Sequence, residues 1–145
     1  MFFEELKLGM TRDIPPVVIK KEKMIDFALN YDNIPLHTDE EYCKNTHFKE
    51  LVAPGVMTFM SVWNSYLTVN FFDDSTLVGK STRIEWLKPV FAGDILSGKA
   101  TVSRIEDRNE KNGMVEIRIN VYNQDGVLVI VNHTETIVKK RLHRG

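Results

Sequence analysis

The chain has 145 residues, 43% of them hydrophobic, which is a common size for one domain with one sizeable core. Its 19 basic and 20 acidic side chains give a net charge of −1, so neither sign is in the excess that recruits nucleic acid or an anionic membrane surface. Cys43 stands alone, which excludes an internal disulfide and is typical of a reducing compartment. The sequence after Met1 lacks a signal-peptide core, and no apolar run is long enough to cross a bilayer. We therefore expect one cytoplasmic domain over residues 1–145.

Helical patterns fill the first half of the chain. Apolar residues at helical spacing predict a helix over 21–30, and acidic residues in a first turn favour a short helix over 39–46. The segment between them, 31–37, contains Pro35 and no periodicity, and is predicted to be an irregular loop. The most apolar helix is predicted over 56–70, and the residues expected on its buried face are Val56, Phe59, Met60, Trp63 and Leu67. Its other face is small and moderately polar, which suits an enclosed helix.

The second half of the chain changes to a period of two. Val115, Ile117, Ile119 and Val121 alternate with polar residues, as a strand with one buried face requires. Turn residues at 123–126 lead to a partner strand over 127–138, and further strands are predicted over 14–19, 76–86 and 94–105. These elements predict an α+β fold in which an antiparallel sheet wraps the apolar helix.

Four local stretches then carry a family resemblance. They are residues 3–9 (FEELKLG), 27–39 (FALNYDNIPLHTD), 52–55 (VAPG) and 88–94 (KPVFAGD). In order and spacing, the chain resembles the MaoC-like (R)-specific enoyl-CoA hydratases and dehydratases along almost its whole length. The resemblance implies a single hotdog domain, an antiparallel sheet around a long central helix, and at least a homodimer. It also implies an acyl-CoA or acyl carrier protein thioester as substrate.

The chain departs from the family pattern at two positions. The family motif has Asn two residues after its Asp, where this chain has Ile34, so a side-chain hydrogen bond that shapes the loop is expected to be missing. Trp63 occupies a helix position that is Ser in some hydratases, which bears on the size of the acyl pocket.

Hydration of a trans-2-enoyl thioester needs a base for the attacking water, a proton for the α carbon and a donor for the developing enolate oxygen. The resemblance implies that Asp32 and His37 are the catalytic acid/base pair and that the Gly55 amide, at a helix N-terminus, is the oxyanion donor. A helix N-terminus suits an oxyanion because its first N–H groups have no partner within the helix. By the same resemblance Pro54, Val56 and Trp63 are expected to contact substrate. Taken without this context, an Asp five residues before a His also fits a turn-capping residue.

The remaining reactive side chains are expected to be structural. His47, His133 and His143 lack acidic or Cys partners at ligand spacing, Cys43 has no activating neighbour, and we predict neither a metal nor a cofactor. Three basic residues of the strand region that could meet coenzyme A phosphates stay unassigned: Lys80, Arg83 and Lys88.

Two alternatives remain open. A hotdog thioesterase generally carries its catalytic carboxylate on the central helix, and residues 56–70 contain no Asp or Glu. A non-catalytic acyl-thioester-binding subunit is the second alternative, and Ile34 is the best argument for it. The direction of the reaction, hydration or dehydration, is not determined by the sequence.

Overall fold

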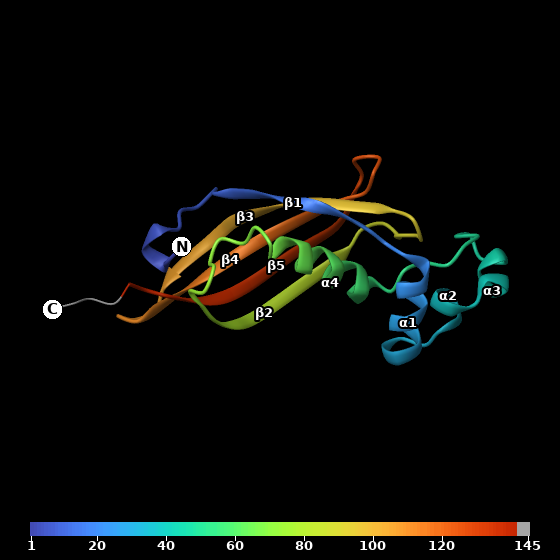
Figure 1. Ribbon diagram of the computed structural model, residues 1–145, viewed down its shortest axis with the longest axis horizontal. Helices are drawn as coiled ribbons and strands as arrows, with labels where there is room; N and C mark the ends of the chain where they lie inside the picture. Colours follow the sequence, from blue (N-terminus) through green and yellow to red (C-terminus); the bar gives the residue numbers. More distant parts are fainter. Residues whose placement is uncertain (142–145) are drawn as a thin grey trace.

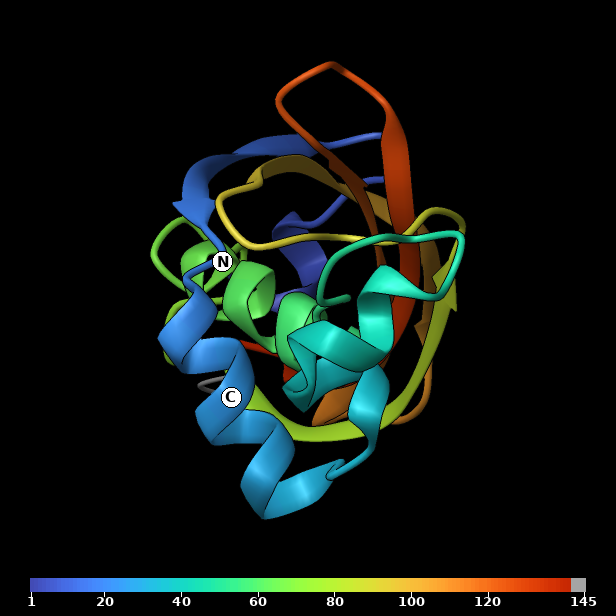
Figure 2. The same cartoon turned by 90° about the vertical axis from the view of Figure 1, so that its right-hand side faces the viewer.

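A five-stranded antiparallel sheet with the strand order β1-β3-β4-β5-β2 curves around one long helix, α4 (Figures 1 and 2). The strands are β1 (Thr11–Val18), β2 (Thr76–Trp86), β3 (Ile95–Asp107), β4 (Asn112–Tyr122) and β5 (Leu128–Lys139). The helices are α1 (Lys21–Tyr31), α2 (Pro35–Thr38), α3 (Glu40–Lys44) and α4 (Gly55–Tyr66), with a 3₁₀ turn over Phe3–Glu5. This computed structural model describes residues 1–141, so His143 lies outside the described residues.

The predicted strands are confirmed, and their alternation positions the core. On β4, Val115, Ile117, Ile119 and Val121 are at most 1% exposed and face α4, while the residues between them lie on the outer face of the sheet. Strand β1 contains Pro15 and Pro16 at a break in its register with β3. Proline is tolerated there because β1 is an edge strand. The two prolines lie where the hydrogen-bond ladder is already interrupted, so their missing N–H groups cost no ladder bond.

Helix α4 differs from its prediction in length and in the face that it buries. It ends at Tyr66 because the chain then tightens into 3₁₀-type turns. In these turns the amides of Thr68 and Val69 donate to carbonyls three residues earlier. Its buried residues are Met57, Thr58, Phe59, Val62 and Tyr66. The predicted buried face is therefore wrong except at Phe59 and the half-buried Trp63. The helix carries apolar residues on two stripes, and only one stripe can face the sheet.

The second stripe of α4 is left uncovered in the chain. Val56, Met60 and Leu67 are each about half exposed. They lie toward β2, the other edge strand, which is exposed along almost its whole length. Leu77, Val78 and Trp86 of β2 are about half exposed as well. The exposed apolar residues of the β2 edge and of the second α4 stripe together form an apolar seam between α4 and β2. Grooves run along this seam.

The helices α1, α2 and α3 lie together at one end of the sheet (Figure 1). The predicted helices over 21–30 and 39–46 are confirmed in their central parts, and Asp39 caps α3 by accepting the Tyr42 amide at 3.1 Å. The irregular loop predicted over 31–37 is wrong in its second half, because Pro35–Thr38 forms one helical turn. Pro35 occupies the start of that turn, where a missing N–H costs nothing and the fixed φ suits a helix.

Among residues 1–141, no helix combines the length and the apolar character that a membrane span requires.

Candidate active site

Three segments that are distant in the sequence meet at the N-terminus of α4. The short stretch 51–54 runs between α2 and the corner that follows β2. Its Val52 amide donates to the Leu36 carbonyl at 3.1 Å, and its Ala53 amide donates to the Val90 carbonyl at 2.7 Å. Val52 also forms an isolated antiparallel bridge with Phe91. These backbone bonds bring the residues of α1–α2, the first residue of α4 and the end of β2 to one place.

Asp32 and His37 are in direct contact there. Asp32 ends α1, its amide bonded to the Ala28 carbonyl, and its carboxylate oxygen Oδ2 lies 3.1 Å from Nε2 of His37. The two side chains differ in exposure: 45% for Asp32 and 8% for His37. The carboxylate therefore faces solvent, and the imidazole lies behind it.

Both ring nitrogens of His37 have partners. Nδ1 lies 2.6 Å from the Val52 carbonyl oxygen, which can only accept, so Nδ1 carries a hydrogen. Nε2 is thereby directed toward the Asp32 carboxyl group at 3.1 Å. A carboxyl group in contact with an imidazole can take up a proton at an oxygen and release it again, which is the chemistry of a general acid/base pair.

Backbone hydrogen bonds fix the loop that joins the two residues. The Ile34 amide donates to the Asp32 carbonyl at 2.9 Å, and the Ile34 carbonyl accepts from the His37 amide at 3.0 Å and from the Thr38 hydroxyl at 3.1 Å. The Ile34 side chain is 45% exposed. The main chain thus supplies the local shape that a motif Asn side chain was expected to supply, and Ile34 is compatible with the Asp32–His37 contact.

Gly55 is the first residue of α4, and Pro54 is its N-cap. At this position the backbone N–H has no carbonyl acceptor within the helix, and the helix dipole is positive. The Thr58 amide donates to the Pro54 carbonyl at 3.1 Å and fixes the orientation of the Pro54–Gly55 peptide, which carries the Gly55 N–H. The buried Thr58 hydroxyl also donates to the Gly55 carbonyl at 2.7 Å, in the next peptide. The amide is therefore a preorganised donor for a developing oxyanion.

The space beside Gly55 is occupied by an indole. A methyl group at Gly55 would lie 2.6 Å from Cε2 and from Nε1 of Trp86, closer than carbon atoms approach without a shift. The Trp86 ring fills the space that the missing Cβ of Gly55 leaves, so a thioester that reaches the Gly55 amide lies alongside the indole.

A pocket of about 330 Å³ joins these groups. Its lining residues are Asp32, Ala53, Gly55, Val56, Thr58, Trp86, Lys88 and Val90. Of the residues expected in the site, Asp32, Gly55 and Val56 line this pocket, whereas His37 and Pro54 are buried beside it. Trp63 lines neighbouring grooves of about 360 and 250 Å³ along the seam between α4 and β2. The predicted roles of these residues stay predictions.

The sequence did not point to Trp86, and Lys88 was left unassigned. Trp86 is the last residue of β2, and Lys88 and Val90 lie in the irregular bend that follows it, where the alternation of a strand no longer applies. Their places in the pocket depend on the backbone contact between this bend and residues 53–55, for which the sequence has no local signal.

The other reactive side chains lie away from this pocket. His133 pairs with Glu116 at 3.3 Å on the outer face of the sheet. Cys43 is fully buried, and burial raises the pKa of its thiol, with the nearby Asp39 acting in the same direction. The thiol is therefore kept protonated and unreactive. Within the part of the chain that the structure describes, no group of three or more His, Cys, Asp or Glu side chains is arranged to hold a metal ion.

Comparison with known families decides the classification. The family described as "MaoC like domain" matches residues 4–123. The chain belongs to this family. Among solved structures, a MaoC-like dehydratase from Rhodospirillum rubrum superposes with a TM-score of 0.90 at 25% identity, covering 99% of each chain. The predicted hotdog fold of the MaoC-like proteins is confirmed by this likeness.

Two further relatives are named for a reaction. The mesaconyl-CoA hydratase of Cereibacter sphaeroides is 28% identical over 143 residues, 97% of this chain, which spans only 41% of that protein. The (R)-hydratase PhaJ1 of Pseudomonas aeruginosa has a TM-score of 0.77 at 24% identity, with 97% of this chain and 86% of that chain covered. The second likeness shows the fold alone.

Proposed function

We propose that the chain catalyses the (R)-specific hydration of a trans-2-enoyl thioester, or the reverse dehydration of a 3-hydroxyacyl thioester. The observation that supports this most is the 3.1 Å contact between Asp32 and His37, with the carboxylate in the same pocket as the N-terminus of α4. This is an acid/base pair next to an oxyanion donor, the combination that addition of water to a conjugated thioester requires.

In the hydration direction, the thioester oxygen accepts the Gly55 N–H and the β carbon faces Asp32. Asp32 removes a proton from a water molecule while the water oxygen bonds to the β carbon. The π electrons move to the thioester oxygen, where the Gly55 amide and the positive end of α4 stabilise the enolate. The enolate then collapses and its α carbon takes a proton from the Asp32–His37 pair. One water is added in total, and the pair returns to its initial protonation state.

In this scheme His37 acts through Asp32. Its imidazole is held by the Val52 carbonyl and is almost buried, so its Nε2 orients the carboxylate and can exchange with it the proton that Asp32 takes from water. Asp32 is the group that contacts water and substrate.

The alternatives predict different chemistry in the same pocket. A hotdog thioesterase generally carries its catalytic carboxylate on the central helix, and Gly55–Tyr66 contains neither Asp nor Glu. A non-catalytic acyl-thioester-binding subunit would bind the thioester without turnover. The backbone-held loop around Ile34 weakens the main argument for that subunit.

We also propose that the chain acts as a homodimer or larger homo-oligomer. The seam between α4 and β2 combines an unpaired edge strand with half-exposed apolar side chains, among them Val56, Met60 and Trp86. An unpaired apolar edge needs cover, and a second copy of the same seam can supply it. For location we propose the cytoplasm, a reducing compartment in which the free Cys43 thiol persists.

The assay that tests the function is incubation with trans-2-butenoyl-CoA and trans-2-octenoyl-CoA, following the loss of the conjugated enoyl absorbance. The proposal predicts turnover of at least one substrate to the (R)-3-hydroxyacyl product, resolved by chiral chromatography. Release of free coenzyme A would instead identify a thioesterase. Saturable binding of both thioesters without loss of absorbance would identify a binding subunit.

A further inference from the structure

Lys88 is the cationic residue of the candidate active-site pocket. It follows β2 at a bend where the chain turns toward residues 53–55. Trp86, Lys88 and Val90 all line the pocket that contains Asp32 and Gly55. Lys88 is an exposed residue and therefore lines the same small cavity as the reacting groups from its solvent-facing side.

The basic residues of this strand region differ in their partners. Lys80 pairs with Glu135 at 3.6 Å, and Arg83 pairs with Glu85 at 3.8 Å, so both are explained as parts of surface ion pairs. Lys88 has no carboxylate within ion-pair distance among residues 1–141. The acid that shares its pocket, Asp32, is already bonded to His37.

We propose that Lys88 binds a carboxylate on the acyl group of the substrate, so that the preferred substrate is a short enoyl thioester with a second, free carboxylate. This inference rests on the proposed function, because it assumes that the acyl group lies between Asp32 and Gly55. The rest of the pocket wall fits the same substrate: Trp86, Val56, Val90 and Ala53 are apolar and suit the carbon skeleton. A carboxylate surrounded by such walls needs a paired cation, and Lys88 supplies it.

The size of the pocket selects the acyl carboxylate over a phosphate. At about 330 Å³ it is at the lower end of the range for ligand sites and holds a short acyl group. In coenzyme A and in acyl carrier protein, the whole pantetheine arm separates the thioester from the first phosphate. A lysine that shares a cavity of this size with the reacting carbons is beside the acyl group, whereas the phosphates lie beyond the far end of the arm.

The test compares two enoyl thioesters of equal carbon number, trans-glutaconyl-CoA, which ends in a carboxylate, and trans-2-pentenoyl-CoA, which ends in a methyl group. The wild type is expected to have the higher kcat/KM for glutaconyl-CoA. Lys88→Met is expected to lose roughly 10- to 100-fold on glutaconyl-CoA, the range of a hydrogen-bonded charge pair, and less than about twofold on pentenoyl-CoA. Lys88→Arg, which keeps the charge, is expected to retain most of the preference.

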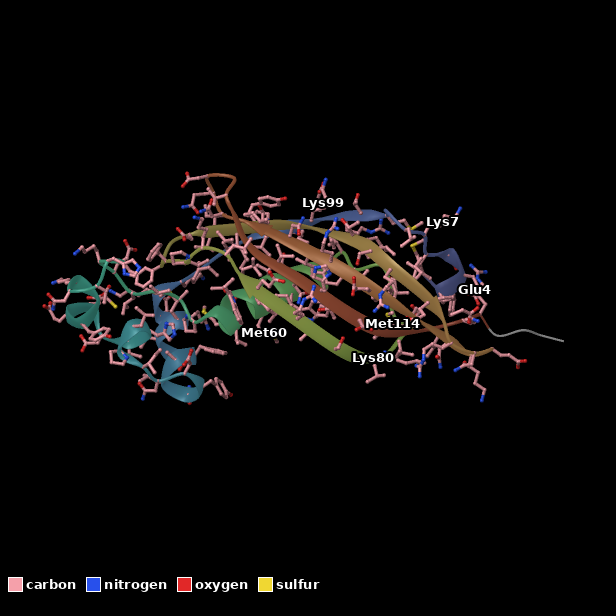
Figure 3. All side chains as sticks on the ribbon, turned by 180° about the vertical axis from the view of Figure 1, so that it is seen from behind. Glu4, Lys7, Met60, Lys80, Lys99 and Met114 are labelled. Atoms are coloured by element: carbon pink, nitrogen blue, oxygen red, sulfur yellow. The ribbon has the colours of Figure 1, made fainter. Side chains whose placement is uncertain are left out.

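The matched control is Lys99→Met. Lys99 lies opposite Asn120 of β4, and its neighbour Ala100 is buried on the inner face of the sheet. The Lys99 side chain therefore lies on the outer face, where Figure 3 labels it. Its ammonium is 4.0 Å from Asp13. Removing this charge changes the net charge as Lys88→Met does, and both thioesters should keep their wild-type kcat/KM.

Binding of saturated thioesters separates this inference from the failure of the proposed function. Glutaryl-CoA and valeryl-CoA cannot be hydrated, and their affinities are measured by calorimetry. Tighter binding of glutaryl-CoA by the wild type, lost in Lys88→Met, supports carboxylate recognition even if neither enoyl thioester turns over. Equal affinities in the wild type, or an unchanged preference in Lys88→Met, overturn the inference.

A third pair of ligands identifies the source of the anion. Glutaryl and valeryl thioesters of pantetheine contain no phosphate. If Lys88 binds phosphate, Lys88→Met weakens both coenzyme A thioesters equally and neither pantetheine thioester, which contradicts the inference. If Lys88 binds the acyl carboxylate, the loss on the glutaryl thioester is the same with and without the phosphates.

Discussion

The contact between Gly55 and Trp86 makes a prediction at the scale of single residues. Gly55→Ala places a methyl group 2.6 Å from the indole, so the half-exposed ring must move, at a cost of about 1 kcal/mol in the free energy of unfolding, the lower end of the range for overpacking. Urea titration measures this loss. Gly79→Ala is the matched control, because a methyl group there meets nothing within 4 Å. Trp86→Leu should make Gly55→Ala nearly neutral, and an undiminished loss in that double variant would contradict the contact.

The direct contact between Asp32 and His37 predicts non-additive losses of activity. Asp32→Asn and His37→Gln each break the same proton exchange, so the double variant should lose about as much kcat/KM as the more damaging single variant. The three values are measured with one enoyl thioester at one pH. A double variant whose loss equals the product of the two single losses would show that the residues act in separate steps.

The sequence identified the residues of this pair but not their arrangement. The motif around residues 32–37 fixes the residue types, and one proline-initiated turn brings His37 back beneath Asp32. The position of Trp86 against Gly55 depends on how the chain after β2 packs against residues 53–55. The hydrogen bond between the Ala53 amide and the Val90 carbonyl holds these two segments together, and no local sequence pattern predicts this long-range contact.

At the scale of elements, the outer face of the sheet carries a network of paired charges on neighbouring strands. Burial alone would raise the pKa of the Glu116 carboxyl, but its hydrogen bonds to Ser103 and His133 and the charge of Arg104 outweigh burial and lower it. The pKa of Glu135 is also lowered, first by the Ser81 hydroxyl at 2.7 Å. Both carboxylates are thus more stable ionised in the folded sheet than in the unfolded chain.

This network predicts how stability changes with acid. Because the folded pKa values lie below the ordinary value of 4.5, the stabilisation is fully present above that pH and is lost as the pH falls through the folded values. The urea midpoint of Glu116→Gln should therefore depend less on pH between about 5 and 3 than that of the wild type. Glu22→Gln, on the exposed face of α1, is the control. A wild-type slope in Glu116→Gln would show that the network does not couple to folding.

Period-two alternation predicted the strands well, whereas the buried face of α4 was predicted wrongly. Burial in β4 alternates strictly over residues 115–121, so one face of this stretch is uniquely apolar. On α4 two apolar stripes are present, and a helix pattern cannot tell which of them faces its own sheet. The extra stripe, with Met60 and Leu67, is the surface that the proposed homo-oligomer would cover.

At the scale of the whole molecule, the seam between α4 and β2 predicts a self-associating chain. Met60, 51% exposed on α4 and labelled in Figure 3, lies in this seam. Met60→Glu places a charge on each copy of the interface and should shift the wild-type dimer or larger oligomer to monomer in light scattering after size exclusion. Leu8→Glu introduces the same charge at an exposed leucine outside the seam and should leave the mass unchanged. A monomeric wild type, or an unaltered oligomer in Met60→Glu, would contradict the prediction.

The fold as a whole was predictable because independent signals agree. Helical periodicity, strand alternation and turn residues predicted the order of elements and a sheet that wraps the apolar helix, and the four family-like stretches implied the same hotdog arrangement. The seam and the grooves along it were not predictable in this way, because they depend on which surfaces remain uncovered after folding.

The central claim is that the Asp32 carboxylate activates water for addition to an enoyl thioester, and the most direct measurement is the hydration rate of Asp32→Asn beside that of wild type. Asp32 is half-exposed, so this isosteric change should leave the fold intact by circular dichroism. Asp26→Asn, an exposed aspartate on α1 outside the pocket, is the control and should keep the wild-type rate. We predict that Asp32→Asn lowers kcat/KM by a factor of roughly 100 or more, as expected for the loss of a general base. A folded Asp32→Asn variant with the wild-type rate would contradict the proposed mechanism.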